Sequence, residues 1–186
     1  MLDTVKDRTN GLDVEALGKV VEAVTEDPSK AKVGFDVTTR WTGQARSETT
    51  VAGYNLAGER IERAHKIVAD EPCELLGSDE APNPQELLMA GLNACLTVGF
   101  VAGASVRGIK LDKLEIRTSG NLDLRGFLGL DDQVPAGYES IDYEVRISGD
   151  GTPEQFEEIH QAVISTSPNF FNLNRAIPLN GKVRVG

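Results

Sequence analysis

The sequence predicts an α+β fold in which antiparallel sheets cover one long apolar helix. Three observations support this prediction. The stretch from Leu87 to Val106 contains no charged residue. Segments with alternating apolar residues come in pairs on either side of it, as hairpins require. Two further segments, near the start and near the end, have apolar residues at helical spacing. Helices combined with hairpin-paired strands are typical of the α+β class.

Residues 1–30 are predicted to be a helical extension of one main domain, residues 31–186. A chain of 186 residues suits one domain with an extension. Within the extension, apolar residues recur at helical spacing from Leu12 to Val24, and Asp27-Pro28 ends the pattern. We expect this amphipathic helix to pack on the main domain.

Three strands are predicted before the central helix. Residues 32–41 alternate apolar and polar side chains, which favours a strand. A turn at Gly43 leads into a second strand, residues 46–53, so that the two form a hairpin. Residues 61–69 form a weaker third strand, and residues 71–82 form a loop that leads into the central helix.

The central helix begins with a specific signal. Asn83 suits the N-cap, Pro84 the first helical position and Glu86 the third position of a capping box. Gly108 is suited to terminate the helix. A helix that is apolar all round is a core element. Its small residues indicate close approach by other backbone; these are Gly91, Gly99 and Gly103.

The same stretch is long enough to cross a bilayer, but we reject that interpretation. It contains the polar residues Asn93, Thr97 and Ser105, and neither an aromatic belt nor a basic cluster flanks it. We therefore expect a long buried helix, covered on all sides by two sheets or by a partner subunit.

Four elements are predicted after the central helix. Residues 111–124 and 138–148 alternate as strands, and a loop joins them. A second capping signature, at Thr152, opens a helix that runs to about Thr166. The tail, residues 177–185, is predicted to be the last strand.

The composition argues against several functions. The net charge of −10 argues against binding nucleic acid through its phosphates and against docking on an anionic membrane surface. Two cysteines are too few for a disulfide framework, and the N-terminus lacks the pattern of a signal peptide, so we expect a cytoplasmic protein. With two histidines and no zinc motif, we expect no metal and no cofactor.

Cys95, in the middle of the central helix, is the first candidate for chemistry. It is either a thiol nucleophile, which needs a nearby positive charge or base, or a small buried apolar residue, a common role of free cysteines. It lies about three turns from the start of the helix, so the helix dipole helps it little. Cys73 is expected to lie exposed or half-exposed in an acidic loop, and His160 is expected to pack rather than to act as a base.

Glu86 and Gln85 are the next candidates. A carboxylate near a thiol can orient an arginine or accept a proton, but Glu86 also suits the capping role. At about 100° per residue, Glu86 and Cys95 lie about 180° apart around the helix, and Gln85 and Cys95 about 80° apart. Arg40 and Arg46, on or beside the first hairpin, are either solvated strand residues or members of a site.

The segment PNPQELLMAGLNACLTVGF, residues 82–100, resembles the central-helix motif of the OsmC/Ohr family of osmotically inducible and organic-hydroperoxide-resistance proteins. Supporting resemblances are ARSETTVAGY in the early strands, LGSDEAPNP before the helix, RGIKLDKLEI after it and SPNFFNLNRAIPL near the end. The resemblance runs from about Lys32 to Val185. It implies an intertwined α+β homodimer in which strands of both subunits wrap two long helices, with sites at the interface.

Peroxidase members of this family have two cysteines, an arginine and a glutamate. The resemblance implies that Cys95 attacks the peroxide and that Arg46, with Arg40 as the second choice, activates it. The second cysteine, which resolves the sulfenic acid as a disulfide, falls at Ser167 in this chain, and the glutamate falls at Gln85. Because neither residue type is kept, the two-cysteine cycle cannot run as in the family, whereas a one-cysteine cycle with an external thiol can.

Three functions follow from these residues. The first is a stress or redox protein that reduces organic hydroperoxides through Cys95 with an external thiol as the reductant. The second is a non-catalytic homodimer that binds a small hydrophobic ligand at its interface. The third is a stress-associated structural protein in which Cys95 is merely buried. The missing second cysteine and the missing glutamate favour the second and the third, whereas the retained Cys95 and the family resemblance favour the first, which we rank ahead.

Overall fold

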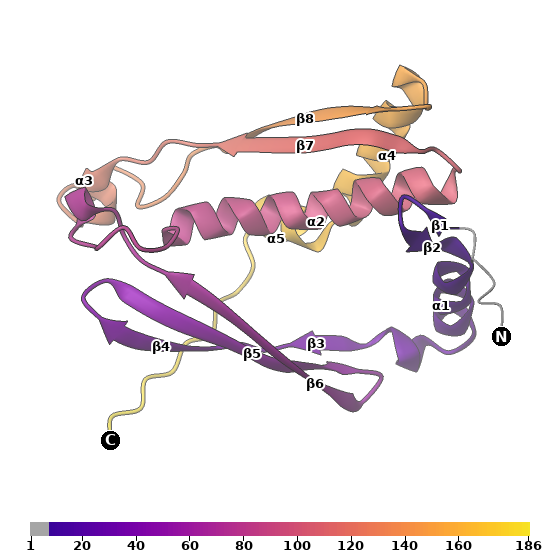
Figure 1. The fold of residues 1–186 in the computed structure, drawn as a ribbon. Helices are drawn as coiled ribbons and strands as arrows, with labels where there is room; N and C mark the ends of the chain where they lie inside the picture. The colour runs from indigo at the N-terminus through magenta and orange to yellow at the C-terminus, as the bar shows by residue number, and fades with distance from the viewer. Residues whose placement is uncertain (1–7) are drawn as a thin grey trace. The chain divides into compact units, whose positions relative to one another are not determined.

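The computed structural model describes residues 8–186 and contains the mixed helices and antiparallel sheets that the sequence predicts (Figure 1). Contacts within the chain divide it into two compact units. The N-terminal unit ends at Leu88, and the C-terminal unit begins at Met89. The division at residue 30 that the sequence suggests stays a prediction.

The N-terminal unit is built around β5, Arg46–Leu56. β6, Glu59–Ala69, pairs with β5 along one edge, and β4, Thr38–Gly43, shares the other edge with β3, Val33–Phe35; all of these pairings are antiparallel. The predicted hairpin is present as β4 and β5, and its turn starts at Gly43, whose φ is +119°. The predicted third strand is present as β6.

The prediction of one strand over residues 32–41 is wrong, because the segment is broken into β3 and β4 at Asp36 and Val37. The cause lies in the central strand. β5 changes register against β6 between Val51 and Gly53, and such a bulge bends a strand. The neighbouring edge strand is interrupted at the same level, and there the Asp36 carboxylate forms an ion pair with Arg60.

α1, Val14–Glu26, confirms the predicted amphipathic helix. Asp13 is its N-cap and accepts a 2.8 Å hydrogen bond from the backbone N–H of Ala16. A short strand pair that the sequence pattern does not reveal precedes it, with β1 at Arg8–Thr9 and β2 at Leu12–Asp13. No α1 residue is buried, so this helix contributes little to a core.

The loop between β6 and α2 is organised by Asp70, whose side chain is fully buried. Its carboxylate accepts hydrogen bonds from the Ser78 hydroxyl at 2.6 Å and from the backbone N–H groups of Glu71, Ser78 and Glu80 at 2.9, 3.1 and 3.2 Å. Gly77 lets the loop close, because a Cβ there would lie 1.7 Å from the Glu71 carbonyl oxygen. These donors, the Ser78 hydroxyl first, hold the pKa of Asp70 below its usual value.

α2, Pro84–Val106, confirms the predicted central helix at both ends. The Asn83 side chain accepts from the Glu86 N–H, and the Glu86 carboxylate accepts from the Asn83 N–H, both at 2.8 Å, which completes the capping box. At the other end, Gly108 has a φ of +71° and the Ile109 N–H reaches back to the Ala104 carbonyl at 3.0 Å. This is the glycine-terminated end that the sequence predicts.

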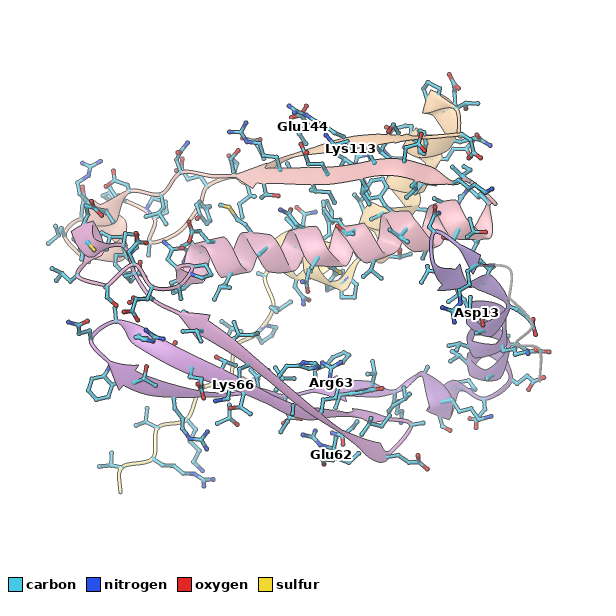
Figure 2. All side chains as sticks on the ribbon, viewed as in Figure 1. Asp13, Glu62, Arg63, Lys66, Lys113 and Glu144 are labelled. Atoms are coloured by element: carbon cyan, nitrogen blue, oxygen red, sulfur yellow. The ribbon has the colours of Figure 1, made fainter. Side chains whose placement is uncertain are left out.

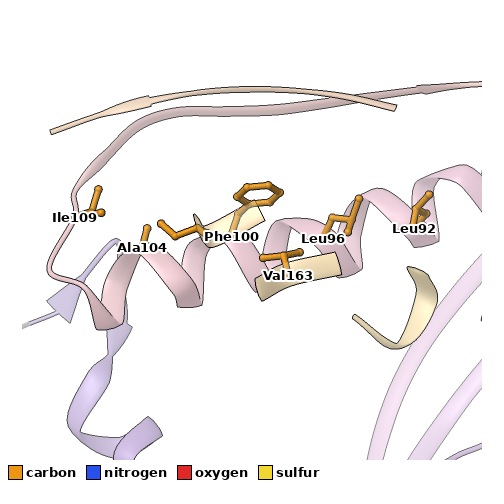
Figure 3. Close-up of a cluster of buried hydrophobic side chains, with 7 residues drawn as sticks. Leu92, Leu96, Phe100, Ala104, Ile109 and Val163 are labelled. Carbon is orange, nitrogen blue, oxygen red and sulfur yellow. The ribbon is translucent and has the colours of Figure 1, made fainter. Parts of the chain in front are cut away.

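One stripe of α2 forms the core of the C-terminal unit (Figure 3). Its members recur every four residues and pack with residues of the following segments; the cluster comprises Leu92, Leu96, Phe100, Ala104, Ile109, Ile159 and Val163. The single chain buries this helix along one stripe, so its cover on all sides, for which the sequence also allowed a partner subunit, stays a prediction. The apolar stripe that alternates with the buried one is exposed; it comprises Ala90, Ala94, Val98 and Val106. Apolar composition all round shows that a helix can be buried, but not how many of its faces one chain covers.

By length and composition, α2 could also cross a membrane. A single helix of this kind is weak evidence for a span, because the core helix of a globular domain meets the same criteria. The packing of Leu96 and Phe100 against Ile159 and Val163 is that of a core helix.

β7, Leu111–Ser119, and β8, Asp142–Gly149, form the antiparallel hairpin of the C-terminal unit. Residues of the inner face pack on the α2 core, whereas Lys113 and Glu144 lie on the face turned away from α2 (Figure 2). Both predicted strands are present but shorter than the alternation suggests. β7 stops at Ser119 because the chain then turns into a short helix, α3, Leu124–Phe127.

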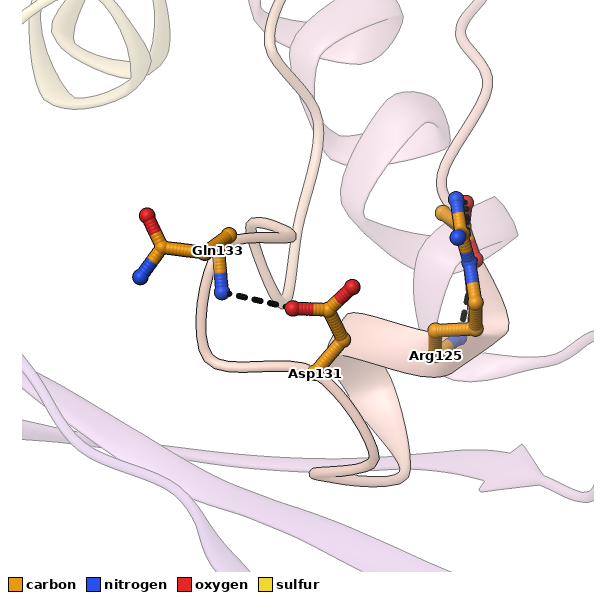
Figure 4. A network of polar contacts seen from close by, with 4 residues as sticks. Arg125, Asp131 and Gln133 are labelled. Atoms are coloured by element: carbon orange, nitrogen blue, oxygen red, sulfur yellow. Dashed lines mark hydrogen bonds and ion pairs between the residues drawn. The ribbon is translucent and has the colours of Figure 1, made fainter.

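Two carboxylates hold the loop between β7 and β8 in shape (Figure 4). Asp123 caps α3 and binds the Arg125 guanidinium, which, through its hydrogen bonds, lowers the pKa of Asp123 to about 2. Asp131 accepts a 2.9 Å hydrogen bond from the Gln133 N–H. At Gly126 a Cβ would lie 2.1 Å from the Pro135 carbonyl oxygen. The loop is therefore closed on itself, which fixes the segment that enters β8.

α4, Pro153–Thr166, confirms the predicted second helix, including the capping box of Thr152. It packs against the glycines of α2, as their positions predict. A Cβ at Gly99 would lie 3.0 Å from the Val163 methyl groups, and a Cβ at Gly103 would lie 3.0 Å from the Ile159 side chain. The absence of side chains at these two positions lets the two helices approach closely.

Two features of the C-terminal segment differ from the prediction. A short helix, α5, Pro168–Leu173, follows α4 directly. The predicted strand at residues 177–185 is wrong, because residues 174–186 contain no helix or strand. Alternation in a sequence yields a strand only where a neighbouring edge accepts its backbone hydrogen bonds, and none of the described strands pairs with this segment. Val183 and Val185 are accordingly 88% and 94% exposed.

The contact between α2 and α4 predicts the effect of filling one glycine. We expect Gly99→Val to lower the free energy of unfolding by about 1–3 kcal/mol, because the added methyl groups collide with Val163. Adding Val163→Ala should recover part of this loss, because the effects of substitutions at two residues in contact on the free energy of unfolding are not additive. Urea denaturation of the single and double variants measures both effects.

Gly18→Val in α1 is the matched control, because nothing lies within 4 Å of a Cβ at Gly18. This substitution should change stability by less than about 0.5 kcal/mol. An equal loss from both glycine substitutions would show that helix propensity, and not the contact with α4, decides the result.

Asp70 predicts a dependence of stability on pH. A carboxyl group whose folded pKa is lowered stabilises the fold above its unfolded pKa, near 3.8 for aspartate, and loses this contribution as the pH falls through the lower folded value. Asp70→Asn removes the titrating group, so the native chain should be more stable than the variant at pH 7. This advantage should shrink below about pH 4. Thermal unfolding from pH 7 to pH 3 measures it, with the exposed Asp132→Asn as the control; an advantage that is constant over this range would contradict the role of Asp70.

Candidate functional site

Cys95 lies on the face of α2 that receives α4 and α5. It lies four residues after Gly91 and four residues before Gly99, so all three residues share one face of the helix. The side-chain amide of Asn169 in α5 donates a 2.7 Å hydrogen bond to the Gly91 carbonyl oxygen, and α4 packs on Gly99 through Val163. The glycines on either side of Cys95 thus bring the junction between α4 and α5 onto its thiol.

Ser167 is that junction. Its backbone N–H closes α4 on the Val163 carbonyl at 2.8 Å, and its hydroxyl caps α5 by accepting from the Phe170 N–H at 3.2 Å. The side chain is only 6% exposed. Its Oγ lies 3.2 Å from the Sγ of Cys95. The structure therefore brings together the two residues that the sequence assigns to the reacting and the resolving positions.

The contact between Cys95 and Ser167 can serve both protonation states of the thiol. A thiol can donate to the serine oxygen, and the serine O–H can donate to a thiolate. Because Ser167 already accepts from the Phe170 N–H, its own proton is free to point at the sulfur. Cys95 is partly buried and is a free thiol. A hydroxyl at this position can hold the sulfur in place, but it cannot form a disulfide with it.

Arg46 lies at the start of β5 in the N-terminal unit and forms an ion pair with Glu80. Glu80 belongs to the loop that Asp70 organises, since its backbone N–H donates to the Asp70 carboxylate. No sequence pattern singles out Glu80 among the acidic residues of this loop. Arg46 and Cys95 belong to different units, so the activation of Cys95 by Arg46 stays a prediction.

The two candidates at the start of α2 have different surroundings. Glu86 is held in the capping box with Asn83, as its structural interpretation predicts. Gln85 is partly buried beside it. Among the described residues, the carboxylate that pairs with Arg46 is that of Glu80 and not that of Glu86, and Gln85, a neutral amide, cannot form an ion pair.

The remaining candidates lie outside this arrangement. Arg40 is an exposed residue of β4, opposite Glu48 of β5. Cys73 is exposed in a short 3₁₀ helix, Cys73–Leu75, and is a free thiol like Cys95. Residues 8–186 contain no group of three or more His, Cys, Asp or Glu side chains that could hold a metal ion.

A second polar group, beside the core of the C-terminal unit, involves His160. The ring of His160 stacks on Phe100 at 5.9 Å between centroids, so the expected packing role is confirmed. It also makes a polar contact that the prediction omits, a 2.7 Å hydrogen bond between its Nε2 and the Tyr143 hydroxyl. Its Nδ1 lies 3.6 Å from a Glu157 carboxylate oxygen. Burial, and then the charge of Glu157, raises the pKa of Tyr143. The alternation of β8 could have shown that Tyr143 faces inward, but not that it meets His160.

A cavity of about 340 Å³ lies in the C-terminal unit, and neither Cys95 nor Ser167 is among its lining residues. Leu92, one turn before Cys95 on α2, forms one wall, and Phe170, whose N–H binds the Ser167 hydroxyl, forms another. Tyr138 lines the cavity from the segment that enters β8, and Tyr143 lines it from β8 itself. The site thus consists of a partly buried thiol and a serine hydroxyl in contact with it, and the same unit contains a cavity with aromatic walls.

Comparisons with known proteins agree with this fold. The sequence model of the OsmC-like protein family matches residues 77–182. The fold is similar to that of an OsmC-like protein from Mycoplasma pneumoniae, with a TM-score of 0.57 and 17% identity over 75% of this chain and 86% of the other. It is also similar to an OsmC-like protein of unknown function from Vibrio cholerae, with a TM-score of 0.53 and 14% identity over 74% and 91%. No curated protein matches the chain.

The matched region contains the central helix, the β7–β8 hairpin and α4 and α5, and therefore both Cys95 and Ser167. At these levels of identity the solved structures establish the fold and nothing finer. The family model covers more than half of the chain, and it does so over the segments that build the site. The chain belongs to the OsmC-like protein family.

Proposed function

We propose that the protein reduces organic hydroperoxides through Cys95 alone, with a small external thiol as the reductant. One observation supports this proposal above the others. The Cys95 sulfur lies 3.2 Å from the Ser167 hydroxyl, at the position where the resemblance to two-cysteine peroxidases implies a second thiol. The two side chains are in contact as that resemblance implies, but a hydroxyl stands where a thiol would resolve the sulfenic acid within the chain.

The proposed cycle balances with one hydroperoxide and two thiols. The Cys95 thiolate attacks the outer oxygen of the hydroperoxide, the O–O bond breaks, and the alcohol leaves after taking a proton, so that Cys95 becomes a sulfenic acid. A small thiol then attacks this sulfur, water leaves, and a mixed disulfide forms. A second small thiol attacks the small-molecule sulfur of this mixed disulfide. A disulfide of the two small thiols leaves, and the Cys95 thiol is restored.

In this cycle Ser167 positions the sulfur and takes no part in electron transfer. Its hydroxyl donates to the thiolate before the attack and can donate to the sulfenate oxygen or accept from the sulfenic acid afterwards. Because Ser167 is itself fixed between α4 and α5, the sulfur is held in one orientation. The C-terminal unit contains no second cysteine that could resolve the oxidised sulfur, so a thiol from solution does so.

Arg46 is the proposed activator of Cys95, with Glu80 holding it in place. A guanidinium near a thiol favours the thiolate, and a carboxylate paired with the guanidinium fixes its direction. If this assignment is right, Arg46→Ala should slow the alkylation of Cys95 by iodoacetamide, whereas Arg40→Ala should not. Equal rates in the native chain and in both variants would remove Arg46 from the site.

We further propose that the working form is a homodimer. The exposed apolar stripe of α2 and two large exposed aromatic residues of the N-terminal sheet, Phe35 at 73% and Trp41 at 76%, are surfaces that an isolated soluble chain rarely leaves open. A second copy of the chain can cover such surfaces symmetrically. Sedimentation equilibrium should return the mass of two chains, and the mass of one chain would contradict this.

The alternative, a non-catalytic protein that binds a small hydrophobic ligand, is favoured by the cavity of about 340 Å³ in the C-terminal unit. The two functions differ in the need for the thiol. Ligand binding survives the loss of Cys95, whereas hydroperoxide reduction does not.

The central experiment is the consumption of cumene hydroperoxide with dithiothreitol as the thiol. We expect the protein to consume the hydroperoxide catalytically and Cys95→Ser to lower kcat/KM by about a thousandfold or more, because the substitution removes the nucleophile. Cys73→Ser is the matched control, since it removes the other free thiol, and it should leave the rate unchanged. Equal activity in the native chain and in Cys95→Ser would overturn the proposed function.

A further inference from the structure

We infer that the cavity of the C-terminal unit binds a small organic ammonium ion that carries one aromatic ring. The aromatic walls hold the ring of this ligand, and Glu139 attracts its charge. The site is separate from the thiol, because neither Cys95 nor Ser167 lines the cavity. The inference therefore does not depend on the proposed function.

Aromatic side chains from three parts of the unit line the cavity. Tyr143 comes from β8, Phe170 from α5 and Tyr138 from the segment that enters β8. The rings of Tyr143 and Phe170 meet edge to face at 6.3 Å between centroids. Leu92 of α2 adds an aliphatic surface. Such walls bind an aromatic ring by removing it from water, and the faces of their own rings attract a cation.

The two tyrosines of the wall are fixed by contacts outside the cavity. A Cβ at Gly120, directly after β7, would lie 2.9 Å from the Tyr138 ring, so this ring lies against the backbone there. Tyr143 is held by the 2.7 Å hydrogen bond between its hydroxyl and His160. The walls are therefore largely formed before a ligand arrives, and little entropy is lost in ordering them.

The lining carries one negative charge and no positive charge. Glu139 is an exposed carboxylate, and the lining residues, all within the described part of the chain, include no lysine and no arginine. Arg175 directly follows the lining residue Asn174, but its guanidinium lies over the Phe171 ring, 4.8 Å from the centroid. An ammonium group in the cavity thus meets a carboxylate that no cation of the lining neutralises.

The phenol of Tyr143 offers a ligand an acceptor and not a donor. Its hydroxyl is bonded to the Nε2 of His160, and a Glu157 carboxylate oxygen lies 3.6 Å from the Nδ1. Because a carboxylate on that side favours a proton on Nδ1, we assign Nε2 as the acceptor of the Tyr143 proton. Burial, and then the charge of Glu157, raises the pKa of Tyr143, so the phenol keeps this proton. Its oxygen retains lone pairs for an N–H donor.

The volume of the cavity limits the ligand to one ring with a short side chain. Small-molecule pockets span roughly 300–1,000 Å³, and a cavity of about 340 Å³ lies at the lower end of this range. The benzylammonium ion combines one ring, one methylene group and one positive charge, so it is a suitable probe.

The experiment compares three probes that share one ring and differ in charge: benzylammonium, benzyl alcohol and benzoate. Their binding to the native protein is followed at low salt by nuclear magnetic resonance of the lining residues. We expect benzylammonium to bind most tightly and benzoate most weakly. Methylammonium, which has the charge but no ring, should give no saturable shift. The preference for benzylammonium should weaken in high salt, because Glu139 is exposed.

Two variants test the two parts of the site. Glu139→Gln should weaken the binding of benzylammonium by about twofold to fivefold, the range expected for a charge pair at a surface, and leave the binding of benzyl alcohol unchanged. Tyr138→Leu should weaken the binding of benzylammonium more than that of benzyl alcohol, because only the cation gains from the face of the tyrosine ring.

Glu158→Gln is the matched control. Glu158 is an exposed glutamate of α4 that does not line this cavity, so its substitution changes the net charge equally but should leave the affinity for benzylammonium unchanged. An equal loss of affinity in both glutamate variants would assign the attraction to the net charge of −10 and overturn the inference. So would benzoate or benzyl alcohol binding as tightly as benzylammonium, or no binding of any probe.

Cys95→Ser separates this site from the proposed function. The variant lacks the proposed nucleophile but keeps every lining residue, so it should bind benzylammonium with unchanged affinity. Shifts that are confined to the surroundings of Cys95 and are lost in Cys95→Ser would place the ligand at the thiol and overturn the inference. A protein that reduces no hydroperoxide can still pass this test, and one that reduces hydroperoxides can still fail it.

Discussion

The close contact between the glycine face of α2 and the α4–α5 segment is the constraint on which the site depends. Gly91, Gly99 and Gly103 present only hydrogen atoms to their neighbours, so Ile159, Val163 and Asn169 approach the helix at contact distance. Cys95 is the one residue with a reactive side chain in that four-residue series. The packing that builds the core of the C-terminal unit therefore also places the Ser167 hydroxyl on the Cys95 sulfur.

The serine at this interface has different consequences for structure and for chemistry. As a cap, Ser167 ends α4, begins α5 and satisfies the Phe170 N–H, which serine does well. As a neighbour of Cys95, it can hydrogen-bond to each state of the sulfur but cannot supply electrons. The fold is thus compatible with the first half of a two-cysteine cycle, and the second half requires a thiol from outside.

The sequence predicted those features that depend on local signals. Short stretches of sequence predict the capping boxes at Asn83 and Thr152, the helix end at Gly108 and the pairing of strands. The structure contains all of these features. The errors have long-range causes. The break between β3 and β4 follows from a bulge in β5, and the failed strand at residues 177–185 lacks a pairing edge.

For the site, the sequence singled out Cys95 and Ser167 by resemblance, but not Glu80, which reaches Arg46 only because Asp70 folds the intervening loop. The bond between Tyr143 and His160 joins a strand to a helix and leaves no local pattern. Contacts of this kind depend on tertiary structure, so composition and periodicity could not reveal them.

The most direct measurement of the relation between Cys95 and Ser167 uses the variant Ser167→Cys, treated with one equivalent of cumene hydroperoxide without added thiol. Peptide mass spectrometry should find a disulfide between Cys95 and the introduced cysteine, because the two side chains are already in contact. The native chain should instead carry an oxidised Cys95 that captures a small thiol added afterwards. Ser165→Cys, at an exposed position of α4, should give no such disulfide. A Ser167→Cys variant in which both cysteines stay reduced would contradict the proposal that Cys95 and residue 167 form the reactive pair of this fold.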